Sequence, residues 1–193
     1  MQTERQQEIV RTAMDIISSE GMSNLTTKNL AKRMGVSEPA LYRHFANKVA
    51  ILAGVLEYFR TNTDTVFSQH IVDDMPAFEK IAAFFRNNFR SFTENPSFVV
   101  VIFSDELYRS EPSLRQAIGV VQQNNRARLL SILENGQQTG EIRTDVPKEH
   151  LALILMSTLR NFVNNWHQSD RAFSLTERGE GLLASLGKLM KPL

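Results

Sequence analysis

The feature that most restricts the fold of this chain is a helical pattern of apolar residues that continues with few breaks along its length. Proline disrupts helix interiors, and the six prolines are sparse enough to leave long uninterrupted segments. Five of them stand at plausible helix boundaries: Pro76, Pro96, Pro112, Pro147 and Pro192. Since no convincing segment alternates with the period of a strand, we expect an all-α protein.

About nine helices account for the pattern. We expect them over residues 3–19, 27–34, 38–45, 48–69, 76–94, 97–108, 113–136, 148–168 and 175–190. Gly21, in a left-handed conformation, ends the first helix and Gly35 the second, while Thr26, Ser37 and Asn47 can cap the next three. The first three helices form a small N-terminal head, and no Gly/Ser-rich linker separates it from the C-terminal helical bundle.

Composition excludes several classes of protein. The chain has no cysteine, which rules out disulfides and thiolate zinc sites, and its four histidines lack metal-ligand spacing. No Gly-rich phosphate loop or nucleophile elbow is present, so we expect no cofactor, no metal and no enzyme; only a catalytic site assembled from distant residues stays open. No apolar run approaches the ~18 residues of a membrane span, and no signal peptide is evident, so we expect a cytoplasmic protein without a membrane partner.

Positive charge is concentrated near the N-terminus. Residues 28–48 hold five basic residues and one acid, Glu38, for a net +4, whereas the whole chain carries +1 and the remainder therefore −3. A local basic patch on a nearly neutral protein suits a polyanion bound at one end, although a solvated helical face explains the same charges.

Residues 29–42 have the pattern of a helix-turn-helix. Ala31 is small enough for close packing, Gly35 permits positive φ in the turn, and Val36 fills the space between the helices. Leu41 and Phe45, four residues apart, hold the third helix on one side. The other side faces outward with Ser37, Glu38, Pro39, Ala40, Tyr42, Arg43 and His44. A short exposed helix of this kind fits a DNA major groove, which is about 12 Å wide.

These residues resemble the TetR family of transcription regulators. The matching positions are Ile9, Ala13, Gly21, residues 25–31, Gly35-Val36-Ser37 and Leu41-Tyr42-Arg43-His44-Phe45-Ala46-Asn47-Lys48. The resemblance is specific over residues 5–55, and beyond them it rests on length and helical pattern. It implies a DNA-binding domain over residues 1–48 and a ligand-binding, dimerising domain over residues 49–193.

The resemblance also implies roles at matching positions. Thr27 and Lys28 look like phosphate contacts, and Arg43 is the best candidate for bidentate recognition of guanine. Lys48 opposes the dipole at the start of its helix, and a docked phosphate would reverse the sign of that effect. The residues expected to face the groove are Ser37, Pro39, Ala40, Tyr42 and His44, with Pro39 and Ala40 able to meet thymine methyl groups.

Several of these assignments have alternatives. Glu38 can accept from cytosine N4, or it can repel nearby phosphates. Tyr42 can pack against the first helix instead of meeting DNA, and His44 can bond only within the head. Val49 departs from the family, which often has an acid after this lysine.

A dimer is expected because one head reads too little DNA for specificity, and the last two helices are its expected seam. The predicted interface residues are Leu153, Ser157, Arg160, Asn164, Leu183, Leu186 and Met190. The alternative is that the last helix only covers its own core. The middle helices are rich in phenylalanine, which is either plain core or the wall of an apolar pocket for a small-molecule effector. The predicted pocket residues are Phe59, Phe85, Phe89, Phe103, Asn124, Arg128, Asn161 and Trp166.

Together these features predict a homodimeric repressor of double-stranded operator DNA that a lipophilic ligand releases. The alternative is a DNA-bound factor without an inducer that acts in chromosome organisation or division, since residues 37–45 also look like nucleoid-occlusion members of the superfamily.

Overall fold

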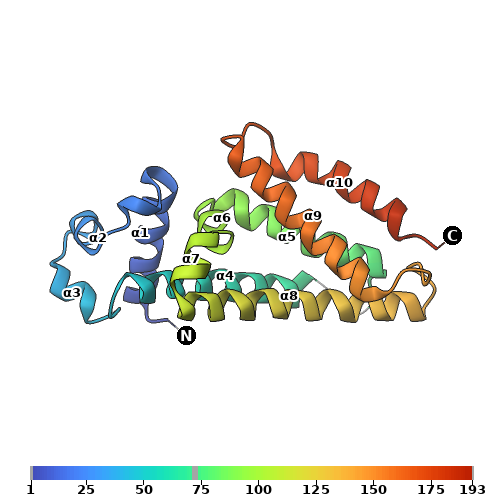
Figure 1. The fold of residues 1–193 in the computed structure, drawn as a ribbon, viewed down its shortest axis with the longest axis horizontal. Coiled ribbons are helices and arrows are strands. Elements are labelled where there is room, and N and C mark those ends of the chain that lie inside the picture. Colours follow the sequence, from blue (N-terminus) through green and yellow to red (C-terminus); the bar gives the residue numbers. More distant parts are fainter. Residues whose placement is uncertain (1, 71–73, 193) are drawn as a thin grey trace. The chain divides into compact units, whose positions relative to one another are not determined.

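The computed structural model describes residues 2–70 and 74–192, and within these ranges every regular element is a helix (Figure 1). The elements are α1 (Glu4–Glu20), η1 (Met22–Asn24), α2 (Thr27–Met34), α3 (Glu38–Tyr42), α4 (Lys48–His70), α5 (Ala77–Glu94), α6 (Ser97–Ile102), α7 (Asp105–Ser110), α8 (Pro112–Gln138), α9 (Lys148–Gln168) and α10 (Leu175–Met190). The all-α expectation is confirmed. The helices form two compact units, Met1–Asn62 with Asn95–Val120, and Thr63–Glu94 with Val121–Leu193.

Most helix boundaries agree with the sequence patterns. The bounds of α2, α9 and α10 are as expected, and those of α1, α4, α5 and α8 differ by no more than two residues. The single helix expected over residues 97–108 is wrong, because two short helices, α6 and α7, occupy this segment. Phe103 leaves helical geometry at φ −105° and ψ 8°, and the Ser104 side chain then accepts from the Leu107 N–H at 3.2 Å to begin a new helix.

The first unit is built on α1. Its inward face buries Ile9, Val10, Ala13, Ile16 and Ile17, as its periodicity predicts, and it packs against α2 and α6. The left-handed conformation expected of Gly21 is wrong in detail. Its φ of 87° is positive, but its ψ of 166° places it in an extended region that is open almost only to glycine.

Aromatic packing joins other helices of the first unit. The Phe59 ring of α4 meets the Phe98 ring of α6 edge-on, with 5.0 Å between centroids and 70° between planes. Both rings are buried. The limits of this unit reflect contacts between residues and differ from those of the predicted DNA-binding domain, residues 1–48. The boundary between the two functional domains near residue 48 therefore stays a prediction.

The second unit is organised around α5, which packs against α9 and α10. Two glycines of α10 permit a close approach, since a Cβ on Gly179 would lie 2.4 Å from Cε2 of Phe89, and one on Gly187 would lie 2.9 Å from Cε1 of Phe78. At the surface, Arg86 of α5 makes a bidentate ion pair with Glu180 of α10, with both N···O distances at 2.8 Å. The hydrogen bonds from Arg86 lower the pKa of the Glu180 carboxyl.

The tight α5–α10 contact gives the first prediction. Gly179→Ala would force a methyl group into the Phe89 ring, so we expect a loss of about 1–3 kcal/mol in the free energy of unfolding. Gly181→Ala on the same helix is the control, because its Cβ meets nothing within 4 Å and alanine favours the helix by about 0.5–1 kcal/mol. Urea denaturation of both variants measures the contrast, and equal stabilities would contradict this packing.

Candidate nucleic-acid interface

The segment from α2 to α3 forms a helix-turn-helix whose ends are set by local chemistry. The Thr26 side chain caps α2 by accepting from the Asn29 N–H at 3.0 Å, as expected. Gly35 takes the predicted left-handed conformation, with φ 65° and ψ 30°. The Val36 N–H then donates to the Ala31 carbonyl at 3.0 Å, which satisfies a carbonyl at the end of α2 and directs the chain into α3.

The third helix is shorter than the predicted span of residues 38–45, because α3 ends at Tyr42 and the chain continues in turns. The N–H groups of His44 and Phe45 both donate to the Leu41 carbonyl, at 2.9 and 3.0 Å, which tightens this end. Ser37 occupies the N-cap position of α3 but makes no capping hydrogen bond, contrary to expectation, and stays exposed.

Three anchors hold α3 and its following turn. Leu41 is 2% exposed and packs into the core of the first unit. Phe45 reaches Gly54 of α4, where an added Cβ would lie 3.2 Å from its Cε1 atom. Gln6 of α1 donates from Nε2 to the main-chain carbonyl of His44 at 3.1 Å. The hydrogen bond from Gln6 was not predicted, because a polar residue on a helix face gives no sequence signal for a partner 38 residues away.

The residues predicted to contact DNA lie on one continuous stretch with varied exposure. Lys28, Ser37, Pro39, Tyr42 and Arg43 are exposed. Thr27, Glu38, Ala40, His44 and Lys48 are half-buried. Tyr42 is 48% exposed, so much of its ring and its hydroxyl group can be reached from solvent. The bond to His44 uses its main chain, so the imidazole takes no part in it.

The structure pairs three of these side chains. The Thr27 hydroxyl donates to Oε2 of Glu38 at 2.8 Å, and the Tyr42 hydroxyl lies 3.4 Å from Oγ1 of Thr27, which is long for a hydrogen bond. This joins the start of α2 to both ends of α3. Thr27 and Glu38 are eleven residues apart with a turn between them, so their spacing in the sequence does not predict this hydrogen bond.

The basic residues of the head have different partners. Arg33 forms an ion pair with Glu20 of α1. Lys48 donates from Nζ to the Met22 carbonyl at 3.3 Å, a contact that partly offsets the cost of a cation in the first turn of α4. An ammonium group has three donors, so this bond leaves two for an anion. Lys28 and Arg43 extend into solvent.

The predicted pocket residues fall in both units. Phe59 and Phe103 belong to the first, and the others to the second. Phe85, Phe89 and Trp166 are buried core. Phe89 belongs to a series of ring contacts that passes through Phe162 to Phe173, with centroids 5.5 and 5.7 Å apart. Arg128 forms an ion pair with Asp64 at 2.5 Å. Asn124 is half-buried and Asn161 is exposed.

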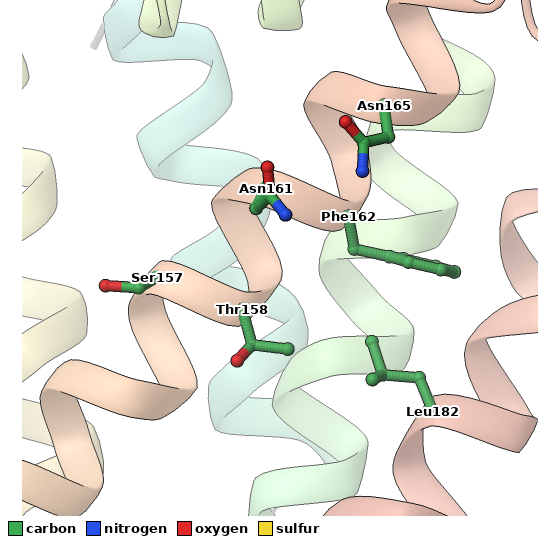
Figure 2. A pocket seen from close by; sticks show the side chains of 6 residues that line it. All are labelled: Ser157, Thr158, Asn161, Phe162, Asn165 and Leu182. Atoms are coloured by element: carbon green, nitrogen blue, oxygen red, sulfur yellow. The ribbon is translucent and has the colours of Figure 1, made fainter.

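A surface groove of about 400 Å³ lies on the second unit, along α9 and against α10. Its lining residues are Ser157, Thr158, Asn161, Phe162, Asn165 and Leu182. In Figure 2 the Phe162 ring extends from α9 toward α10, and Leu182 extends from α10 into the same space. The groove thus brings together Asn161, predicted for the pocket, and Ser157, predicted for the dimer interface.

The predicted interface residues divide into two groups. Leu153, Ser157 and Arg160 are exposed on α9, and Asn164 is half-buried. Leu183, Leu186 and Met190 are only 2–3% exposed, because α10 packs on α5 of the same chain. For these three the alternative that α10 covers its own core describes their surroundings, and contact with a second chain stays a prediction. Leu189, at 57% exposed, is the large apolar residue of α10 that faces solvent.

Among the residues that the structure describes, no cluster of three or more His, Asp or Glu side chains could hold a metal ion. No helix in the described ranges is both long and apolar enough to cross a membrane.

Comparison with known proteins finds similarity over nearly the whole chain. The nucleoid occlusion factor SlmA of Vibrio campbellii is 26% identical over 190 residues, which cover 98% of this chain and 97% of that protein. The class C tetracycline repressor protein of Escherichia coli is 42% identical over 72 residues, 37% of this chain and 33% of that one. The crystal structure of the regulator FadR from Bacillus subtilis in complex with stearoyl-CoA shares the fold, with a TM-score of 0.77, 23% identity, and coverage of 93% of this chain and 96% of that one.

Two family models account for most of the sequence. Residues 9–55 match the bacterial regulatory proteins of the tetR family, and residues 63–186 match the C-terminal region of YsiA-like proteins. The first match contains the helix-turn-helix, and the second covers more than half of the chain. The chain therefore belongs to the TetR family of DNA-binding bacterial regulatory proteins.

Proposed function

We propose that this TetR-family regulator is a repressor that binds a pseudo-palindromic operator as a homodimer and is released by a lipophilic small molecule. In this proposal residues 1–48 bind DNA, and residues 49–193 hold the ligand and the dimer contact. The similarity to a tetracycline repressor protein, 42% identical over 72 residues, supports repression as the outcome of DNA binding.

The observation that carries the proposal is the outward face of α3. Leu41 anchors the helix from below, while Pro39, Tyr42 and Arg43 are left in solvent. Exposed tyrosine and arginine side chains can both donate hydrogen bonds, and the phosphates and base edges of a DNA duplex offer the acceptors. Arg43 is assigned to guanine, Pro39 and Ala40 to thymine methyl groups, Ser37 to the groove, and Tyr42 and His44 mainly to the DNA backbone. Thr27, Lys28 and Lys48 are assigned to phosphates.

Arg43→Ala tests this placement of α3. Removing a bidentate contact should cost about 1–3 kcal/mol of binding free energy and relax preference at one base pair of each half-site. Lys32→Ala is the control, because Lys32 is an exposed cation of α2 outside the predicted contact set. Operators selected from a random duplex pool, followed by titration of single-base-pair variants, measure both effects. If Arg43→Ala kept wild-type preference at every base pair, α3 would not read DNA in this way.

The dimer is supported by the exposed side of α9. Leu153 and Ile154 are 65% and 46% exposed, large values for aliphatic residues on a helix that buries Leu151, Leu155 and Leu159 on its other side. The exposed residues Ser157, Asn161 and Asn165 repeat every four positions along the same helix. Amide groups both donate and accept, so two copies of this face can pair with each other.

Leu153→Asp tests this interface. Burying a leucine contributes about 1.5–3 kcal/mol, a symmetric contact counts it twice, and a buried unpaired carboxylate adds a further penalty. We therefore expect a monomer where the wild type is a dimer, with weaker binding to a two-half-site duplex. Val120→Asp, at a 44% exposed aliphatic position of α8 in the first unit, should leave the dimer intact. Sedimentation velocity distinguishes the two variants, and a dimeric Leu153→Asp protein would exclude this face.

The ligand class is supported by the interior of the second unit. The Phe85 ring contacts the rings of both Phe84 and Phe89. Asn87 and Asn88, which lie between Phe85 and Phe89 in the sequence, are also buried. The Phe162 ring, which contacts Phe89, lines the groove along α9 together with Leu182 and several polar side chains, and apolar walls with a few polar groups are typical of sites for lipophilic ligands. The stearoyl-CoA in the crystal structure of FadR makes a long acyl chain the representative ligand to test.

Stearoyl-CoA should therefore dissociate the protein from its selected operator, measured as a fall in the fluorescence anisotropy of a labelled duplex. A ligand shifts the equilibrium only by its differential affinity for the free and DNA-competent states, so about 100-fold preference is needed for about 100-fold weaker binding. Coenzyme A without an acyl chain is the control. Equal affinity for operator with stearoyl-CoA, with stearate and without either would contradict the lipophilic class.

A second candidate function has its own support. The whole-chain similarity to SlmA favours a DNA-bound factor in chromosome organisation that needs no inducer. A genome-wide binding map separates the two, because a local repressor occupies few promoters, whereas a chromosome-organising factor occupies sites scattered along the genome.

A further inference from the structure

Glu38 is the one acid within the basic segment of residues 28–48, and the structure gives it an unexpected partner. It begins α3 at a half-buried position, and its Oε2 atom accepts the Thr27 hydroxyl at 2.8 Å. Among the ion pairs of the described residues, none involves Glu38. A hydroxyl therefore stabilises this carboxylate where a cation would be the stronger partner.

Phosphate oxygens at neutral pH act mainly as hydrogen-bond acceptors, so a hydroxyl group must donate its proton to bind them. The Thr27 hydroxyl has one donor, and in this structure it goes to Glu38. The Tyr42 hydroxyl is oriented in turn toward Oγ1 of Thr27 at 3.4 Å, a long and weak contact that it can exchange for a phosphate at little cost. Thr27 can donate to a phosphate only by giving up the carboxylate.

We propose that Glu38 is a positioning residue that competes with DNA phosphate for the hydroxyl donor of Thr27 and so lowers affinity for every duplex, whatever its sequence. The inference rests on the proposed assignment of Thr27 to a phosphate. The Thr27 bond uses one of the two carboxylate oxygens, so recognition of a base by the other oxygen is a separate outcome that the experiment must distinguish from competition. In the competition, Glu38 acts on DNA through Thr27.

Glu38→Gln separates this role from the alternatives. A glutamine amide keeps the size of the side chain, and it can donate to Oγ1 of Thr27 and so release the Thr27 donor to phosphate. We expect binding to tighten about three- to tenfold, equally for a selected operator and for a random-sequence duplex of about 30 base pairs. Asp15→Asn removes one carboxylate from an exposed position of α1 and should change affinity less than about twofold.

A double-mutant cycle with Thr27→Val tests the competition directly, because valine keeps the shape of threonine and lacks the donor. In the Thr27→Val background the gain from Glu38→Gln should fall to within about twofold. A gain that persists there would mean that Glu38 acts by charge repulsion alone and would overturn the proposal. A loss of affinity confined to one base pair would make Glu38 a base-reading residue, and weaker binding to all duplexes would make it a structural clamp; both results exclude competition.

Failure of this inference differs from failure of the proposed function. If the wild type binds no duplex at low salt, the assignment of α3 to DNA fails. If it binds and Glu38→Gln does not tighten binding, only the role of Glu38 fails. Thermal denaturation of each variant establishes that the head remains folded.

Discussion

A helix of five residues has almost no stability of its own, because nucleating a helical turn costs more than its few hydrogen bonds return. The surface offered by α3 therefore depends on the contacts that hold it. Leu41 supplies the buried apolar anchor, Phe45 packs where Gly54 leaves room, and Gln6 binds the carbonyl of His44. These three contacts involve different elements of the first unit and fix the position of α3 on its core. The backbone of α3 therefore loses little further entropy on binding DNA, although exposed side chains such as Arg43 still lose rotamer freedom.

The same arrangement explains why an acid can be accommodated in a basic segment. With Thr27 as its partner, Glu38 ties α2 to α3 and contributes to the geometry of the motif, while its charge opposes the phosphates that the motif is assigned to meet. Sequence-independent affinity comes mostly from cations near phosphates, and too much of it holds a regulator on the wrong sites. An internal carboxylate that reduces phosphate contacts leaves discrimination to the groove-facing residues.

Local signals in the sequence predict most of the fold. The bounds of α2 follow from Thr26 and Gly35, since a cap and a left-handed glycine act on their immediate neighbours. The break between α6 and α7 also has a local signal, because Ser104 followed by two acids is typical of a helix start. The apolar run over residues 98–103 led instead to the prediction of one continuous helix. Contacts between distant residues, such as Thr27 with Glu38 and Gln6 with His44, depend on how helices cross and have no periodic signature. For the same reason the sequence identified the outward residues of α3 but not their partners.

The apolar stripe of α10 shows the limit most clearly. Periodicity establishes that Leu183, Leu186 and Met190 share a face, yet it does not say which surface covers that face. Here α5 covers it, and Gly179 and Gly187 bring the two helices together. The second unit thus completes its core within one chain, and the dimer contact that we propose uses the mixed face of α9, apolar at Leu153 and Ile154 and polar along Ser157, Asn161 and Asn165. Because that face is only partly apolar, we expect each chain to fold before it pairs, so the spacing of the two DNA-binding heads in the proposed dimer can change without unfolding either chain.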